Sequence, residues 1–118
     1  MIAEKRERDR FRVALMIEAA ELARRDAEPG REAFLNDRRS RAVLLLDLIH
    51  LTESADKLSA SFKKGNPAVD WRRLRELRNE GLVHDYPEAD LADIWSFVRN
   101  ELPKLRRRLD RVAYSPSS

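Results

Sequence analysis

The sequence contains no cysteine and only two histidines. The lack of cysteine excludes disulfide bonds, thiolate catalysis and cysteine-ligated metals. His50 and His84 are then the only imidazole groups, so we expect no structural zinc site. Glycine is also scarce, with 3 residues among 118, whereas 38% of the residues are charged. This composition favours helices with solvated outer faces over a strand-rich sandwich, and it predicts an all-α fold.

Long hydrophobic runs are absent as well. No segment approaches the roughly 20 apolar residues that a membrane-spanning helix requires. The amino terminus, MIAEKRERDR, is charged and has no apolar run behind it, so we expect a cytoplasmic protein. The length suits a single domain, which we place at residues 1–112, with residues 113–118 as a disordered tail.

The excess of positive charge is small, with 24 Lys and Arg against 21 Asp and Glu. Arginine greatly outnumbers lysine, which suits bidentate contacts with phosphate. The charge therefore permits a nucleic-acid partner. The same bias equally fits arginine and glutamate pairing along helix surfaces, so charge alone does not decide between these readings.

Apolar residues recur with helical spacing in the first third of the chain. This spacing predicts a helix from about residue 4 to 25, with a buried stripe made of Phe11, Leu15, Ala19 and Leu22. The Pro29-Gly30 pair ends that helix, and a short helical turn follows over residues 32–36. Asn36 and Asp37 then offer a cap for the next helix.

The longest helix is predicted from about residue 39 to 62 and is apolar almost all round. One small bundle core cannot easily cover both sides of such a helix. We therefore expect part of it to pack against a second subunit. The alternative is a central helix that is wrapped by its own neighbours. Gly65 and Pro67 form the turn that follows.

Two more helices complete the predicted fold, an up-and-down bundle of four to five helices. Asp70 can cap a short helix that begins at Trp71 and ends near residues 81–84. The last helix has apolar residues at alternating spacings of three and four between Leu91 and Leu109. Proline at position 103 predicts a kink near residues 99–102, because proline removes a backbone hydrogen bond and clashes with the preceding turn.

The string LRNEGLVHDY, from Leu77 to Tyr86, holds an arginine, a polar residue and, a few positions later, a histidine. This arrangement resembles the signature of HEPN ribonucleases, and the tyrosine two residues after the histidine is typical of the HepT-like branch. Three further passages agree with that family in order and spacing, namely LTESADKL, NPAVDW and DLADIWSFVRNELPKL. Together the matching passages cover about residues 34–109.

The resemblance implies a HEPN-type bundle that forms a homodimer through its central helices, with the two copies of the motif meeting in one RNA-cleaving cleft. Arg78 would bind the scissile phosphate, Asn79 would assist, and His84 would transfer protons. The family's reaction uses the 2′-hydroxyl of the RNA as nucleophile, so the resemblance implies a ribonuclease that needs neither a metal nor a cofactor.

The resemblance also implies a partner and a mode of regulation. The chain would be the toxin of a toxin-antitoxin pair, cleaving cellular RNA, with tRNA as one candidate. An MntA-like antitoxin with a nucleotidyltransferase fold would neutralise it by transferring AMP to Tyr86. Glu53 matches an acidic position of the family's central helix, where it would orient Arg78 or lie at the dimer seam.

One departure from the family concerns spacing. Many HepT-like sequences have four residues between the arginine and the histidine, whereas this chain has five. At about 100° per residue, the extra position would rotate His84 away from its usual direction in a regular α-helix. We therefore predict a bulge or an early helix end at Gly81. A regular α-helix through Val83, with His84 facing solvent, would contradict this.

A second departure concerns Thr52 and Ser54, which stand where glycine and alanine are commoner in the family. The alternative function is a non-catalytic helical subunit that partners a separate nucleotidyltransferase and has lost nuclease activity. At the level of single residues, His84 could instead end a helix, and Arg78 could form a surface salt bridge with Glu80 or Asp85. His50 is predicted to be a core or interface histidine.

Overall fold

The computed structural model describes residues 2–82 and 88–114, and it confirms the all-α prediction: no strand occurs in these ranges. His84 and Tyr86 lie outside the described residues. No helix within them is both long and apolar enough to cross a membrane. The elements in chain order are α1 (Ile2–Asp26), α2 (Arg31–Asn36), α3 (Arg38–Asp56), α4 (Ala60–Gly65), α5 (Trp71–Leu77), the π-helix η1 (Arg78–Leu82), α6 (Glu88–Ser96), the π-helix η2 (Phe97–Glu101) and α7 (Leu102–Leu109).

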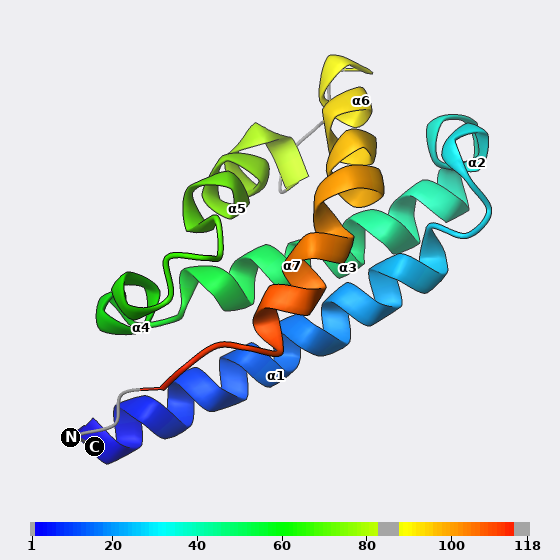
Figure 1. Ribbon diagram of the computed structural model, residues 1–118. Helices are drawn as coiled ribbons and strands as arrows, with labels where there is room; N and C mark the ends of the chain where they lie inside the picture. The colour runs from blue at the N-terminus through cyan, green and yellow to red at the C-terminus, as the bar shows by residue number, and fades with distance from the viewer. Residues whose placement is uncertain (1, 83–87, 115–118) are drawn as a thin grey trace.

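The helices form an elongated up-and-down bundle, with principal extents of 49 × 23 × 20 Å. Helices α1 and α3 lie side by side and run in opposite directions, with α2 at the turn between them (Figure 1). Helix α5 lies on α3, and the segment from α6 to α7 returns along the bundle until α7 meets α1. The segment that carries Arg78 is thus held between the central helix and the last helical stretch.

Local signals set several helix ends as predicted. The Asp37 side chain caps α3 by accepting a hydrogen bond from the backbone N–H of Ser40 at 3.0 Å. The Asp70 side chain caps α5 in the same way, through the N–H of Arg73 at 3.0 Å. Gly30 adopts a positive φ of 101° between α1 and α2, a conformation that favours glycine.

The long central helix is interrupted, and the prediction of one helix through residue 62 was wrong. Helix α3 ends at Asp56, and α4 starts after Ser59, whose hydroxyl caps it by accepting from the N–H of Phe62. The buried Asp9 carboxylate of α1 holds this break, because it accepts hydrogen bonds from the Ser59 N–H at 2.9 Å and its hydroxyl at 2.7 Å. The break therefore depends on a partner 50 residues away.

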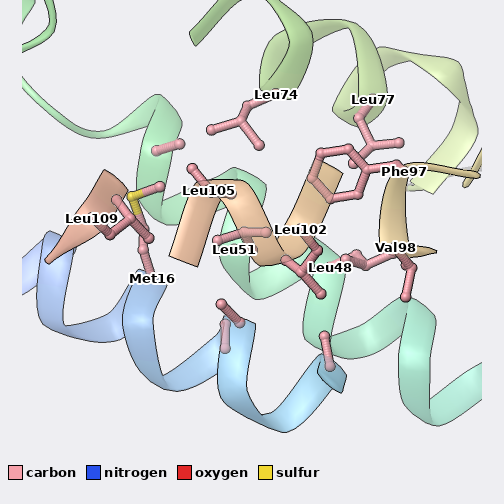
Figure 2. Packing of buried hydrophobic residues seen from close by; sticks show 14 of the residues in the cluster. Met16, Leu48, Leu51, Leu74, Leu77, Phe97, Val98, Leu102, Leu105 and Leu109 are labelled. Carbon is pink, nitrogen blue, oxygen red and sulfur yellow. The ribbon is translucent and has the colours of Figure 1, made fainter. Parts of the chain in front are cut away.

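The core lies between α1, α3, α5 and the last helical stretch (Figure 2). Met16, Leu48, Leu77 and Ile94 are completely buried within it. Burial of each such side chain contributes about 1.5–3 kcal/mol relative to exposure. The last stretch supplies the buried set Leu91, Ile94, Phe97, Val98, Leu102, Leu105 and Leu109, most of which its spacing predicted.

The buried face predicted for α1 was wrong by about one residue of helical rotation, roughly 100°. Phe11 is 58% exposed, and Leu15 and Leu22 are only partly buried. Ala19 is buried as predicted, and the other buried apolar residues of the helix are Val13, Met16, Ala20 and Ala23. The three alanines carry small side chains, which let α1 approach its neighbours closely, so the larger apolar residues are left at the edge of the interface.

The central helix α3 buries only part of its apolar surface within the chain. Leu44 and Leu48 are completely buried, whereas Val43 and Leu46 are 46% and 51% exposed. His50 is exposed on the same face of the helix, so of the two predicted positions, core or interface, the core position is wrong. We call Val43, Leu46 and His50 the outer strip of α3.

The last helical stretch departs from α-geometry where the kink was predicted. Residues Phe97–Glu101 form a π-helix, and the chain changes direction before α7 (Figure 1). The wider turn lies just ahead of Pro103, whose ring would clash with a regular preceding turn.

Ala113 and Tyr114 are held in place, although we predicted a disordered tail from residue 113 onward. Ala113 exchanges two hydrogen bonds of 2.8 Å with the Asn66 side chain. The Tyr114 ring lies against Phe62 and beneath the guanidinium of Arg10. These contacts tie Ala113 and Tyr114 to α4 and α1.

Candidate active site at the Arg78 π-helix

Helix α5 positions the start of the candidate site. Leu74 and Leu77 are buried against the core, which fixes the rotation of the helix. Trp71 anchors its first turn, because its indole N–H donates to the carbonyl oxygen of Asn66 at 3.0 Å and its ring meets Phe62 edge-on. These contacts place Arg78, the residue after Leu77, against α3.

The backbone then widens into the π-helix Arg78–Leu82. A departure from regular α-helix was predicted at this place, and it is confirmed. A π-turn closes its hydrogen bonds over one residue more than an α-turn, so it can absorb an inserted residue without ending the helix. The direction of His84 itself lies outside the described residues.

Arg78 pairs with Glu53 of α3 rather than with Glu80. The Arg78 Nε atom lies 3.4 Å from Glu53 Oε1, and the two side chains are 32% and 37% exposed. Within residues 2–82 and 88–114, the terminal amino groups of Arg78 have no hydrogen-bond acceptor. Glu53 therefore holds the guanidinium by one edge, and the donors of the other edge are of the kind that bind an oxyanion in a planar two-point contact.

Asn79 follows Arg78 on the same π-turn and is exposed. The structure thus brings together three of the five residues singled out in the sequence, with Arg78 and Asn79 on η1 and Glu53 facing them from α3. His84 and Tyr86 belong to the stretch that is not described.

A cavity of about 10 Å³, room for about one water molecule, lies beside Arg78 between α3 and α5. Arg75 and Lys63 share its lining with Arg78, and burial lowers the pKa of Lys63 below its ordinary value. Thr52 also lines the cavity, but its hydroxyl donates to the Leu48 carbonyl at 3.0 Å. Three basic residues and one acid, Asp56, line this cavity, so its net charge is positive and favours anions.

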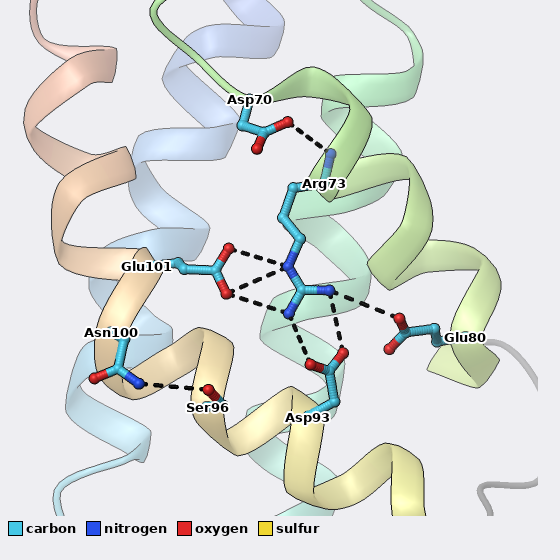
Figure 3. A network of polar contacts seen from close by, with 7 residues as sticks. All are labelled: Asp70, Arg73, Glu80, Asp93, Ser96, Asn100 and Glu101. Atoms are coloured by element: carbon cyan, nitrogen blue, oxygen red, sulfur yellow. Dashed lines mark hydrogen bonds and ion pairs between the residues drawn. The ribbon is translucent and has the colours of Figure 1, made fainter.

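Arg73 ties this segment to the last helical stretch (Figure 3). Its guanidinium makes paired hydrogen bonds to Asp93 at 3.1 Å and binds Glu101 at 3.0 Å, and it lies 3.7 Å from Glu80 of η1. The Arg73 side chain is only 16% exposed. Three elements, α5, η1 and the α6–η2 stretch, are thereby joined through one cation.

The titration of this cluster follows from its geometry. Burial alone would lower the pKa of Arg73, but the hydrogen bonds with Glu101 and Asp93 outweigh it and raise that pKa. The pKa of Asp93 is lowered, by its contact with Glu80 and by the Arg73 guanidinium. Arg73 and Asp93 therefore both stay ionised through the neutral range. Sequence reasoning missed Arg73, because its partners lie 20 and 28 residues away and no local spacing links them.

A family model described as ribonuclease HepT-like matches residues 16–112. The chain belongs to the HepT-like ribonuclease family. The match includes α3, α5, η1 and the last helical stretch, so it covers every element that builds the site. The family match confirms the resemblance to HepT-like ribonucleases that the string LRNEGLVHDY indicated, and it supports an RNase function.

Individual relatives agree with the family. The chain is 25% identical over 81 residues to "Probable ribonuclease HepT" of Thermococcus cleftensis, covering 69% of this chain and 73% of that protein. It is 27% identical over 79 residues to "Putative RNase MJ1380" of Methanocaldococcus jannaschii, covering 67% and 72%. No solved structure matches significantly.

Proposed function

We propose that this HepT-like chain is a metal-independent ribonuclease toxin whose cleavage centre is built on the Arg78 π-turn. The observation that carries the proposal is the Arg78–Glu53 pair, in which one edge of the guanidinium is fixed and the other has no acceptor among residues 2–82 and 88–114. That arrangement suits a planar contact with the two oxygens of a phosphate.

The reaction requires few catalytic groups from the protein, because RNA carries its own nucleophile. The 2′-hydroxyl attacks the adjacent phosphorus, and the bond to the 5′-oxygen of the next nucleotide breaks. His84 is proposed to remove the proton from the hydroxyl or to deliver one to the leaving oxygen, since imidazole titrates near neutral pH. Arg78 would stabilise the negative charge that gathers on the phosphorane, with Asn79 as a further donor.

A homodimer through the outer strip of α3 would supply the second proton-transfer group. Val43 and Leu46 leave apolar surface uncovered on this strip, and Leu15 and Leu22 of α1 border a depression of about 530 Å³ beside it. Glu53 lines that same depression and also holds Arg78. Two copies that met on this face would therefore bring their Arg78 residues toward one shared cleft.

Regulation by AMP transfer to Tyr86 fits the charge of the site. An added phosphate group near basic residues such as Arg78, Arg75 and Lys63 would occupy donors that the RNA phosphate needs. It would also place negative charge two residues from His84 in the chain. An MntA-like nucleotidyltransferase antitoxin is the proposed source of the AMP.

The deciding experiment measures RNA cleavage with EDTA present, using purified wild type and the His84→Ala variant. Circular dichroism and sedimentation first establish that both proteins are folded and have the same mass. Cleavage by wild type but not by His84→Ala is the expected result. Equal cleavage by both would place the chemistry elsewhere. No cleavage by either, with Tyr86 shown unmodified by mass spectrometry, would favour the non-catalytic binding subunit.

A further inference from the structure

A second basic cavity lies away from the Arg78 turn. It has a volume of about 510 Å³ and is formed by the C-terminal half of α1 together with Trp95, η2 and α7. This volume falls within the range of small-molecule sites, about 300–1000 Å³. Four arginines and two glutamates contribute to the lining, so its net charge is positive: Arg24, Arg99, Arg106, Arg107, Glu21 and Glu28. We call it the α1–α7 groove.

The arginines of the groove fall into two classes. Arg106 binds Glu21 at 3.0 Å, and Arg24 lies 3.5 Å from the same carboxylate. Arg99 and Arg107 are exposed and form no ion pair or hydrogen bond within residues 2–82 and 88–114. The paired arginines, Arg24 and Arg106, form part of the wall of the groove. The other two keep their hydrogen-bond donors for an anionic ligand.

Trp95 adds an aromatic platform to this groove. Its ring stacks on Phe34 of α2, with centroids 5.7 Å apart and an angle of 27° between the planes. Trp95 is only partly buried and lines the cavity. A ring held in this way can receive a nucleobase, and an aromatic platform beside unpaired cations is how proteins commonly bind single-stranded nucleic acid.

The groove would stay open in the proposed dimer. Ala20, Arg24 and Ala27 point from α1 into the groove, whereas Leu15 and Leu22 border the depression beside α3. At about 100° per residue, these two sets lie on opposite sides of α1. The groove also lies on the other side of the last helical stretch from the side chains of Asp93 and Glu101, which bind Arg73.

We infer that the α1–α7 groove binds a single-stranded tract of the RNA substrate, with Arg99 and Arg107 on the phosphates and a base on Trp95. The inference rests on the proposed ribonuclease function and extends it, because the groove would select substrates that have an unpaired segment away from the cleaved bond. Phosphate contacts supply affinity without sequence preference, so the groove selects strandedness rather than sequence.

The test uses a fluorescent 12-nucleotide single strand of 2′-O-methyl RNA, which cannot be cleaved because it lacks a free 2′-hydroxyl. Arg99→Ala/Arg107→Ala is compared with Arg108→Ala/Arg111→Ala, which removes the same charge from exposed positions outside the groove lining. We expect the groove pair to weaken binding about tenfold and to reduce the salt slope by about 1.4, since each phosphate contact contributes about 0.7. The control pair should change affinity less than threefold.

Fluorescence gives an independent readout. In Trp71→Phe, Trp95 is the remaining tryptophan, and base stacking should quench its emission as the oligonucleotide is added. Any of three results would overturn the inference. These are equal losses of affinity in the two arginine pairs, an unchanged Trp95 emission, and AMP binding as tightly as the 12-mer. Cleavage of unmodified RNA in EDTA separates the two proposals. Cleavage without binding in the groove would contradict only the groove inference. Binding in the groove without cleavage would contradict only the proposed ribonuclease function.

Discussion

Glu53 Oε1 holds the Nε edge of Arg78 at 3.4 Å, across the contact between α3 and the π-turn. Because the carboxylate fixes the plane of the guanidinium, we expect Glu53→Gln to lower kcat about tenfold while leaving the fold unchanged. Arg78→Lys should lower kcat at least a hundredfold, since an ammonium group cannot make a planar two-point contact. Single-turnover cleavage in EDTA measures both effects. A Glu53→Gln enzyme with wild-type kcat would show that Glu53 has no orienting role.

Removal of Arg73 should destabilise the protein strongly. Arg73→Met leaves Asp93, Glu101 and Glu80 facing one another without their shared cation. We expect a loss of about 3 kcal/mol in the free energy of unfolding, as for other broken, partly buried ion networks. Urea unfolding followed by circular dichroism measures it.

Arg72→Met is the matched control, because Arg72 is an exposed neighbour on the same helix. It should change stability by less than about 0.5 kcal/mol. Similar losses in Arg72→Met and Arg73→Met would mean that the charge network contributes nothing specific.

The stability of the chain should depend on pH through Asp47. Asp47 of α3 is 7% exposed, and its Oδ2 atom has no hydrogen-bond partner in the part of the chain that the structure describes. Burial, together with the neighbouring carboxylate of Asp26, raises its pKa to about 7 from 3.8. Between these two values the folded chain holds a proton that the unfolded chain releases, so this group's contribution to stability is lost as pH rises from about 4 to 7.

Asp47→Asn removes this titration and keeps the shape of the side chain. We expect the variant to gain on the order of 2 kcal/mol relative to wild type between pH 4.5 and 7.5. Comparison with wild type at each pH cancels the opposite trend of Asp37 and Asp93, whose pKa values are lowered. Parallel stability profiles for the two proteins would show that Asp47 is ionised throughout.

The outer strip of α3 should control assembly. Leu46 is 51% exposed, and Leu46→Asp would place a charge on the apolar surface that the proposed dimer buries. We expect light scattering to give twice the chain mass of 13.8 kDa for wild type and the single mass for Leu46→Asp. Ala68→Asp, at an exposed position outside the strip, should remain dimeric. A monomeric wild type would exclude the shared cleft.

Local sequence signals predicted the parts of the fold that depend on neighbours in the chain. The caps at Asp37 and Asp70 are examples, because each side chain bonds to an N–H three residues later. The break at Ser59 was missed because its stabilising partner, Asp9, is 50 residues away. The role of Arg73 was missed for the same reason, because its three acidic partners belong to other segments of the chain.

The same distinction between local and distant signals applies to the candidate site. The arginine and the polar residue of the family signature pointed to Arg78 and Asn79, and one surplus residue pointed to the distorted turn. The rotation of α1 could not be read in this way. Its apolar residues occupy several sides of the helix, and only close packing of Ala19, Ala20 and Ala23 decides which side is buried.

The π-turn at Arg78–Leu82 has a consequence for how relatives are found and aligned. A search pattern with a fixed arginine-to-histidine distance would reject this chain, although the helix that carries the arginine continues unbroken through Leu82. An alignment that places its one-residue gap inside this turn keeps Arg78 and the flanking helices in register with their counterparts. A gap placed inside α5 or α6 would instead shift part of that helix by about 100° and mispair its buried face.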